Sequence, residues 1–466
     1  MQTHLIAIKL SRAIALKRTA ALLAALTLSG GSVYADSLFD QPDPNFNGRV
    51  SSTGVVTPGS TANIRGSGFK SGQEIQLLRS GQNIAKDQVL TADQEGKFST
   101  TVAIPADAAV GRHPVVVQIA KPSAATIFEL KVSPDIKFAG ADKFDIASER
   151  LLPGMYQSAY SAASNALFVT SSVGRPPVKE STLLKVNADT LKVEGNVTPA
   201  VDKSDDKGQV MAVYGVAVDD VQGTVWVTNT RADTIAVYKQ SDLSLIKQFD
   251  RGVAPHARDV VVDGKHHRAY VSAFGVSEIL VFDTQKLEQL DSIAIKSGTR
   301  EDFSPLSVEL DLKNNKLYTV SLTTNEAAVI DLAKQETVKV YALPGAKGAS
   351  GVTVAPEAQV LFVASQGSDN VLLVDLNNGN VLHTVSVGAG PLNAVWDAKS
   401  KLAYVVSRAA GSIAVIDLDG KLIANLDAGS LPNHLSTDGK GHVFAINKAR
   451  GKEDETRDRI TRISVK

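Results

Sequence analysis

The hydrophobic and polar positions of this chain alternate in short β-type runs, and one apolar phrase with a central aromatic residue recurs seven times. Successive aromatic residues are separated by 58, 44, 48, 44, 42 and 40 positions. A repeat of about 40–50 residues lies in the range of β-propeller blades. The pattern therefore predicts seven blades. The seven aromatic residues are Phe168, Trp226, Tyr270, Tyr318, Phe362, Tyr404 and Phe444.

Each repeat can be divided into four strands, and the third repeat shows the division most clearly. Its apolar runs occupy residues 260–263, 269–272, 279–283 and 289–293. The central runs are apolar at nearly every position, which is typical of strands that are covered on both faces. Blades packed between two neighbours meet this condition.

The last repeat supplies only three strands, because the chain ends at Lys466 shortly after the third. An unpaired edge would otherwise remain in the seventh blade. The segment 143–147, which precedes the first blade, has strand character. We predict that it completes blade seven and closes the ring; the alternative is a simple linker strand.

Residues 49–135 contain a different set of short β-type runs, separated by turn residues such as Pro58-Gly59. This spacing predicts a β-sandwich. The pieces 66–69, 93–98 and 104–107 resemble bacterial immunoglobulin-like modules. The predicted fold is thus all-β: an immunoglobulin-like β-sandwich (49–135), then a seven-bladed propeller (136–466) closed by an N-terminal strand. Residues 36–48 are predicted to form a polar tail.

The first 35 residues have the pattern of an export signal. Four basic residues precede an apolar stretch at 19–28, and small residues then lead to Ala35. The apolar stretch is too short to span a bilayer easily, which argues against a membrane anchor; a buried helix is the other alternative. The pattern predicts a cleaved signal peptide and a soluble, periplasmic mature protein.

Charge and cysteine content narrow the possible functions. Removal of residues 1–35 leaves 45 basic and 49 acidic residues, a net charge of −4. No global basic excess would attract nucleic acid or anionic lipid, so such binding would need a local patch. The chain contains no cysteine, which excludes disulfides, thiolate metal sites and a cysteine nucleophile.

Several motifs together resemble the YVTN-repeat family. They are the phrase Val225-Trp226-Val227-Thr228-Asn229, an aspartate after the third strand of most repeats, and a proline that opens several blades. Residues 154–161 and 460–463 further resemble YncE-type periplasmic propellers. The resemblance covers residues 140–466. It implies an exported seven-bladed propeller with single-stranded DNA-binding activity.

Polar residues recur at the start of the predicted inner strands, eleven positions before each aromatic residue. These positions are predicted to line the mouth of the central channel, on the face that propellers commonly use for ligands. The alternative is that a wet channel simply tolerates polar residues. The positions are Gln157, Gly215, Asp259, Ser307, Gly351, Asn393 and Asn433, with His434 in the last place if blade seven is one residue shorter.

Basic residues in the loops of the same face could form a phosphate-binding rim, and Tyr156, Tyr214 and Phe274 could stack on bases. Acidic residues share these loops, so a mixed, solvated rim is the alternative. The basic residues are Arg175, Lys179, Arg231, Arg251, Arg258, Arg300, Lys347, Arg408, Lys448 and Arg450; the acidic ones are Glu180, Asp233, Glu278, Glu301, Asp302, Glu326 and Asp369.

Metal and catalytic sites have little support in the sequence. No histidine has the paired spacing of a zinc or copper site, and we predict no metal, cofactor or catalytic residue. The segment 265–268 is predicted to be a surface turn on the opposite face. Glu309, Arg258 and His434 could imitate a lactonase set, although they lie on different blades and acid–base catalysis needs them near one substrate.

The resulting hypothesis is a monomeric, exported, non-catalytic binding protein that uses the top face of its propeller. Single-stranded DNA is the ligand that the resemblance implies. A lactonase-type enzyme and a cell-envelope scaffold for protein–protein interactions are the alternatives. The predicted ligand-binding residues are Gln157, Arg231, Arg258, Asp259, Arg300, Ser307, Asn393, Arg408, Asn433, His434 and Lys448.

Overall fold

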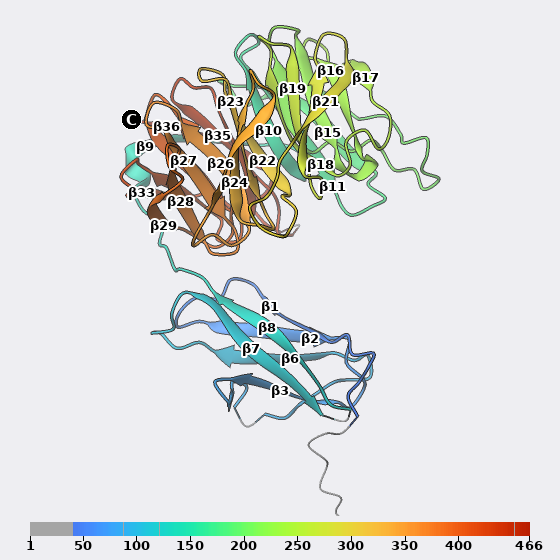
Figure 1. Ribbon diagram of the computed structural model, residues 1–466, viewed down its shortest axis with the longest axis vertical. Coiled ribbons are helices and arrows are strands. Elements are labelled where there is room, and N and C mark those ends of the chain that lie inside the picture. Colours follow the sequence, from blue (N-terminus) through green and yellow to red (C-terminus); the bar gives the residue numbers. More distant parts are fainter. Residues whose placement is uncertain (1–40, 87, 121, 452) are drawn as a thin grey trace, which may run out of the picture.

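The computed structural model describes residues 41–86, 88–120, 122–451 and 453–466, so the predicted signal peptide lies outside the described residues. Two β modules follow one another along the chain (Figure 1). The described residues include two short 3-10 helices, η1 (Ala141–Lys143) and η2 (Thr230–Ala232). No helix in the described part is long and apolar enough to cross a membrane.

The N-terminal module consists of two sheets that enclose one core. One sheet has the order β1-β2-β6; the other has the order β4-β3-β7-β8, with β5 paired to β3. Side chains alternate between buried and exposed along β2 and β7, as expected of sheets with one solvated face. The strands are β1 (Arg49–Thr53), β2 (Thr61–Ser67), β3 (Glu74–Arg79), β4 (Gln82–Asn83), β5 (Leu90–Thr91), β6 (Phe98–Ala103), β7 (Gly111–Ala120) and β8 (Ala124–Val132).

The segment 41–48, predicted as a polar tail, contacts this sandwich. The Phe46 ring packs edge-on against Phe69, with 5.9 Å between ring centroids. Asp43 Oδ2 accepts the Lys70 ammonium at 2.6 Å. The contact of Phe46 with the core adds apolar burial to a small module.

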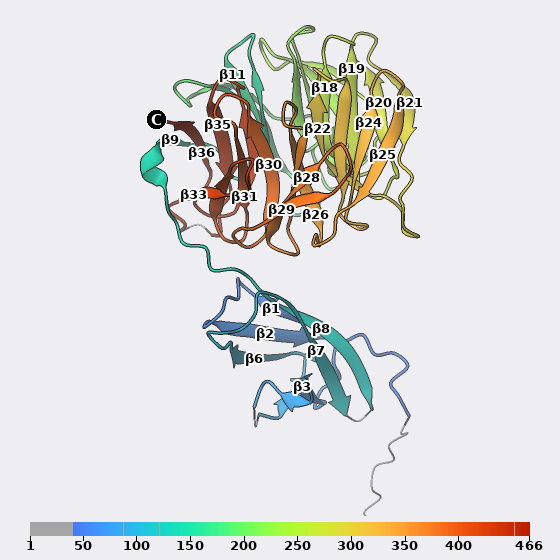
Figure 2. The ribbon, with the colours of Figure 1, turned by 60° about the vertical axis from the view of Figure 1, so that its left-hand side comes forward.

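The propeller consists of seven four-stranded antiparallel blades arranged in a ring (Figure 2). The fold prediction is confirmed in this respect. Blades one to three are β10 (Met155–Ser161), β11 (Ala166–Val173), β12 (Glu180–Asn187), β13 (Val193–Val197); β14 (Val216–Asp219), β15 (Thr224–Asn229), β16 (Thr234–Lys239), β17 (Leu245–Gln248); and β18 (Ala257–Asp263), β19 (Arg268–Ala273), β20 (Glu278–Asp283), β21 (Glu288–Ala294).

Blades four to seven repeat the same order from the inner to the outer strand. They are β22 (Pro305–Asp311), β23 (Lys316–Ser321), β24 (Glu326–Asp331), β25 (Glu336–Ala342); β26 (Ala349–Ala355), β27 (Val360–Ser365), β28 (Asn370–Asp375), β29 (Val381–Ser386); β30 (Pro391–Asp397), β31 (Leu402–Ser407), β32 (Ser412–Ile416), β33 (Leu422–Asp427); and β34 (Pro432–Thr437), β35 (His442–Asn447), β36 (Arg459–Val465), β9 (Phe144–Arg150).

The predicted ring closure is present. Strand β9 pairs antiparallel with β36 in a continuous register, from Phe144 opposite Val465 to Arg150 opposite Arg459. The first strand of the propeller thus becomes the outer strand of its last blade. The Phe144 ring also packs against Tyr404 of blade six, with centroids 6.3 Å apart, so closure buries apolar surface as well as pairing an edge.

The recurring aromatic residues fill the contacts between blades. Trp226 belongs to a buried cluster with Phe282 of blade three, and Phe362 packs against Trp396 of blade six. All seven recurring aromatics are buried. The repeat in the sequence therefore corresponds to the packing of each blade on the next.

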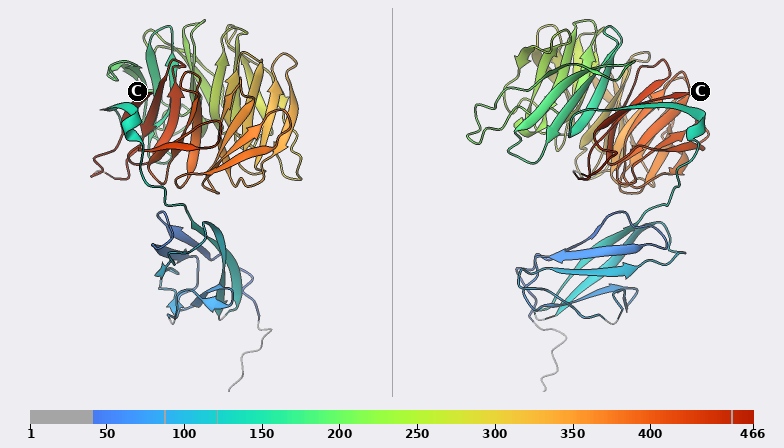
Figure 3. Two further views of the ribbon diagram at one scale, coloured as in Figure 1. Left: turned by 90° about the vertical axis from the view of Figure 1, so that its left-hand side faces the viewer. Right: turned by 180° about the vertical axis from the view of Figure 1, so that it is seen from behind.

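The sandwich is attached to the top face of the propeller, the face that carries the loops between the second and third strands. Arg112 Nε donates to the carbonyl of Gly367 (3.1 Å), and Lys131 Nζ binds Asp369 Oδ1 (2.6 Å) in the β27–β28 loop. Asp369 is only 2% exposed. The linker is tied to blade six, where Ala139 and Asn425 exchange backbone hydrogen bonds. Figure 3 shows the sandwich beyond this face, beneath the C-terminal blades.

We expect Phe144→Ala to destabilise the propeller by about 3–4 kcal/mol, because it removes a buried aromatic side chain from the closing strand. The side chain is 4% exposed. Both tryptophans of the chain, Trp226 and Trp396, lie in the propeller, so urea unfolding followed by tryptophan fluorescence reports on this module.

The matched control is Ile146→Ala in the same strand, whose side chain is 45% exposed. It keeps the backbone pairing with β36 and should cost less than about 1 kcal/mol. Equal losses in the two variants would contradict the packing role of Phe144.

Candidate functional site

The predicted mouth residues connect the inner strands of neighbouring blades. Gln157 Oε1 accepts the backbone N–H of Val216 (3.1 Å), and Asp259 Oδ2 accepts that of Val308 (3.1 Å). Asn393 Oδ1 likewise accepts the backbone N–H of Leu435 at 2.8 Å. Each acceptor lies at the mouth position of one blade, and each donor directly follows the mouth position of the next. The polar character of these positions therefore has a structural reason.

Two mouth positions are glycine, and there the next blade approaches the backbone itself. A Cβ added at Gly215 would lie 2.7 Å from the Arg258 carbonyl oxygen, and one at Gly351 would lie 2.7 Å from Asn393 Cα. No side chain fits at either place. The ring is thus held by side-chain acceptors at some junctions and by close backbone contact at others.

In blade seven the mouth position equivalent to Asn393 is His434. His434 lies opposite Ile446, two residues after the recurring Phe444, as Asn393 lies opposite Val406 in blade six. His434 Nδ1 accepts the backbone N–H of Ser158 in blade one at 3.4 Å. Burial lowers the pKa of His434 to about 3. The ring is therefore neutral near pH 7, with its proton on Nε2.

A cavity of 90 Å³ lies at this mouth, bounded by the upper ends of six inner strands and, in blade two, by Tyr214 and Thr230. It brings together seven of the eleven predicted site residues and both predicted tyrosines. The predicted residues that line it are Gln157, Arg258, Asp259, Ser307, Asn393, Asn433 and His434, together with Tyr156 and Tyr214.

Tyr156 is the centre of a group of aromatic and basic side chains beside this cavity. Its ring meets Tyr214 edge-on, with centroids 4.7 Å apart. The Lys448 Nζ atom lies 2.9 Å from the centroid of the Tyr156 ring, a cation–π geometry when the amine is protonated. Lys448 directly follows β35, so the β35–β36 loop brings it to the mouth.

Three arginines complete this group, which we call the basic mouth cluster: Arg231, Arg258, Arg408 and Lys448. Arg408 donates from its guanidinium to Asn433 Oδ1, and Asn433 Nδ2 donates to the Tyr156 carbonyl at 2.6 Å. Arg231 lies beside the Tyr214 hydroxyl. Within the described part of the chain, none of the four forms an ion pair with a carboxylate.

Three of the acidic residues predicted in the same loops are engaged elsewhere. Asp369 binds Lys131 of the sandwich, and Glu326 accepts the Ser297 hydroxyl (2.7 Å) and the Gly298 N–H (2.8 Å). Asp233 accepts the backbone N–H of His256 at 2.8 Å. These carboxylates hold loops in place, so they do not neutralise the basic mouth cluster by direct contact.

The electrostatics of the cluster are those of crowded, partly dehydrated cations. Burial, together with the neighbouring Arg408 and Arg258, lowers the pKa of Lys448 to about 6, against an opposite effect of Asp458. Burial also lowers the pKa of Arg258 and of Arg408. Burial raises the pKa of Asp259. An anion at the mouth would relieve this repulsion.

Other predicted basic residues lie outside the cluster. Arg300 is exposed in the β21–β22 loop and does not line the mouth cavity. Arg251 pairs with Asp202, and Arg450 donates to the Ala409 carbonyl at 2.6 Å. The predicted rim is therefore concentrated in a few residues rather than spread around the ring.

Glu309 faces the channel below the mouth. It lines a wider cavity together with Asp259, Asn393 and His434, and Thr353 Oγ1 donates to its Oε1 at 3.1 Å. Burial raises the pKa of Glu309 to about 8, so the carboxyl is largely protonated at neutral pH. Arg258 lines the mouth cavity and Glu309 the channel, whereas His434 lines both.

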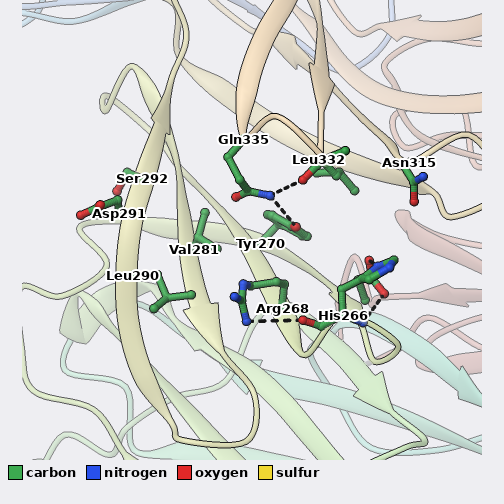
Figure 4. Close-up of a pocket in the computed structure, with 12 residues that line it drawn as sticks. His266, Arg268, Tyr270, Val281, Leu290, Asp291, Ser292, Asn315, Leu332 and Gln335 are labelled. Atoms are coloured by element: carbon green, nitrogen blue, oxygen red, sulfur yellow. Dashed lines mark hydrogen bonds and ion pairs between the residues drawn. The ribbon is translucent and has the colours of Figure 1, made fainter.

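A larger cavity of 620 Å³ lies between blades three and four on the opposite face (Figure 4). The predicted surface turn 265–268 borders it through His266 and Arg268. His266 binds Asp263 at 2.6 Å, and Arg268 binds Asp283 at 3.2 Å. Gln335 Nε2 donates to the Leu332 carbonyl at 2.5 Å. These polar side chains at the border of the cavity therefore already have hydrogen-bond or ion-pair partners within the protein, which favours a structural role for them over ligand binding.

Sequence reasoning named Tyr156 and Lys448 but missed their direct contact. It also missed the inter-blade hydrogen bonds of the mouth residues. The regular spacing of Gln157, Asp259 and Asn393 was a signal for these bonds, because equivalent polar residues at one position of every blade meet equivalent backbone groups.

Comparisons with known proteins agree with the propeller. No family model matches the chain. YncE of Salmonella typhi, an uncharacterized protein, is 25% identical over 340 residues, which cover 69% of this chain and 91% of YncE. YncE of Escherichia coli K12 is 25% identical over 245 residues, covering 50% of this chain and 65% of YncE. The predicted resemblance to YncE-type propellers is confirmed.

A solved structure shares the fold. Hydrazine synthase of Kuenenia stuttgartiensis superposes with a TM-score of 0.53 at 18% identity, over 64% of this chain and 93% of the solved chain. At this identity the likeness concerns the fold alone.

We expect Asn393→Ala to destabilise the propeller by about 1–3 kcal/mol, because it leaves the Leu435 N–H without its acceptor at a partly buried junction. Urea unfolding followed by tryptophan fluorescence measures this loss. The exposed Asn380→Ala should change the free energy of unfolding by less than about 0.5 kcal/mol. An Asn393 variant as stable as the wild type would show that the inter-blade bond contributes nothing.

Proposed function

We propose that this protein is an exported, periplasmic, non-catalytic binding protein whose propeller binds a polyanion at the basic mouth cluster, with single-stranded DNA as the ligand. The observation that carries the proposal is the group of four basic side chains around Tyr156 and Tyr214, none of them ion-paired with a carboxylate among the described residues. Export follows from the signal-like pattern of residues 1–35.

The geometry supports this ligand class in two ways. Arginine guanidinium groups bind phosphate through paired hydrogen bonds. Here Arg258 lines the opening, and Arg408 and Arg231 contact two residues that line it, Asn433 and Tyr214. The tyrosines offer ring faces and edges beside those cations, the combination used for single-stranded nucleic acid. The mature chain is expected to carry a net charge of −4. Dissolved salt screens the repulsion from charges that lie more than about 8–10 Å from the bound strand, so this net charge does not oppose binding at the cluster itself.

The small size of the mouth cavity is also consistent with a polymer that lies across the surface. A cavity of 90 Å³ holds a phosphate or part of a base, whereas drug-sized ligands occupy roughly 300–1,000 Å³. The strand would therefore place one or two groups in the mouth and continue over the top face.

Arg258→Ala and Arg408→Ala should each weaken binding of a fluorescein-labelled single-stranded oligonucleotide about 5- to 30-fold in fluorescence anisotropy. Each variant should also make the slope of log K against log salt shallower by about 0.7, because one phosphate contact is lost.

Arg300→Ala is the control, because this exposed arginine lies outside the cluster; it should change the affinity less than about twofold. A double variant, Arg258→Ala with Arg408→Ala, that binds like the wild type would end the top-face proposal.

Binding should also depend on pH through Lys448, whose pKa is about 6. The protonated form of Lys448 adds a positive charge at the mouth. The affinity should therefore be about 3- to 10-fold higher at pH 5.5 than at pH 7.5, at constant ionic strength, and the extra affinity should be lost as the pH is raised through 6. Anisotropy titrations at the two pH values measure this change.

Lys448→Met should remove most of the pH dependence while leaving the affinity at pH 7.5 within about threefold. His256 is the competing titratable group, because its pKa is lowered by burial and by the nearby Arg258 and Arg231. Persistence of the effect in Lys448→Met and its loss in His256→Gln would assign the proton to the histidine instead.

A further inference from the structure

Lys448 differs from the three arginines of the basic mouth cluster because its amine lies over the ring of Tyr156. Its Nζ atom lies over that ring at 2.9 Å, and no carboxylate of the described residues pairs with it. The side chain is half-buried. The nearby cations Arg408 and Arg258 disfavour the protonated amine of Lys448. Asp458, which accepts the Gly154 N–H at 3.3 Å, favours it.

A lysine placed beside other cations and away from water loses its proton easily, and this is one of the recognised ways to make an amine nucleophilic near neutral pH. The usual surface lysine is instead stabilised as ammonium. Lys313 illustrates this, because its ion pair with Glu357 at 2.8 Å raises its pKa.

We propose that Lys448 is a nucleophilic amine that forms an imine with aldehydes that carry a phosphate group. The ligand's phosphate would be held by Arg408 and Arg258, which places its carbonyl carbon next to Nζ. This inference rests on the anion-binding part of the proposed function. Within that function, the fitting aldehyde is the ring-opened sugar of an abasic nucleotide in single-stranded DNA.

The reaction balances without a cofactor. The Nζ lone pair adds to the carbonyl carbon, and the carbon–oxygen π pair moves to the oxygen. One amine proton passes to that oxygen, and the resulting carbinolamine loses its hydroxyl group with a second proton as one water molecule. The product is a carbon–nitrogen double bond to Lys448.

Lys448 is joined to the mouth cavity through Tyr156, which lines the cavity and carries the amine on its ring. The lysine side chain is only half-buried, so it is not sealed in the core. Asn433 fixes both neighbours, because it accepts from Arg408 and donates to the Tyr156 carbonyl. The amine, the aromatic ring and one phosphate anchor are therefore held in a set arrangement.

The first test uses pyridoxal 5′-phosphate, a phosphorylated aldehyde, with borohydride reduction at pH 7.5 and peptide mass mapping of the full mature chain. Lys448 should be modified at least about tenfold faster than Lys179, an exposed lysine of the same face. Arg408→Ala should slow labelling by pyridoxal 5′-phosphate but not by pyridoxal, which lacks the phosphate. Labelling of Lys448 no faster than Lys179 would overturn the proposal.

The second test separates DNA from a small phosphorylated aldehyde. An oligonucleotide with a natural abasic site should become covalently linked on borohydride treatment, and one with a tetrahydrofuran abasic analogue, which has no aldehyde, should not. Linkage should be lost in Lys448→Met and in Lys448→Arg, the second variant retaining a cation if the first folds poorly. Lys179→Met should behave like the wild type.

The outcomes distinguish this inference from the proposed function. Normal binding of intact single-stranded DNA with no trapping of either aldehyde at Lys448 would refute the imine and leave the binding function. Labelling of Lys448 by pyridoxal 5′-phosphate in a protein that binds no DNA would support the amine and refute DNA as the ligand.

Discussion

The ring depends on a hydrogen bond repeated around the central channel, in which a side chain at the mouth of one blade accepts the backbone N–H of the next inner strand. Inner strands are edges of their own sheets, so their outward backbone groups need partners from elsewhere. Gln157, Asp259, Asn393 and His434 supply these partners at four junctions. At Gly215 and Gly351 the backbones approach too closely for a side chain.

This constraint also shapes the candidate site. Because the mouth residues are used to join blades, they form a fixed, mostly neutral floor, and His434 in particular is held neutral. The charged groups near this floor are Arg258 of β18 and, in connections between second and third strands, Arg231, Arg408 and Lys448. The protein thus separates the polar residues that hold the ring together from the charged residues that could bind something to it.

The position of the sandwich follows from the same arrangement of loops. Lys131 binds Asp369, which also accepts the backbone N–H of Gly390 at 2.7 Å. The Gly390 carbonyl in turn accepts the N–H of Arg408 at 2.8 Å. The docking contact of the N-terminal module is therefore connected through two backbone groups to a residue of the basic mouth cluster. This places the module next to the candidate site, although its immunoglobulin-like character stays a prediction from sequence.

The sequence by itself determined the number of blades, their strand order and the closing strand, because every blade buries an aromatic residue at the same position and the last repeat lacks one strand. It also located the mouth positions, since a fixed distance from Tyr270 or Tyr404 is a fixed place in a blade. Only the tertiary structure decided which loop charges matter. Arg231, Arg258, Arg408 and Lys448 belong to four different blades, Arg300 lies apart, and Asp369 and Glu326 are taken up by other contacts. Charge balance at a surface depends on where side chains of distant segments meet, and no local pattern encodes that.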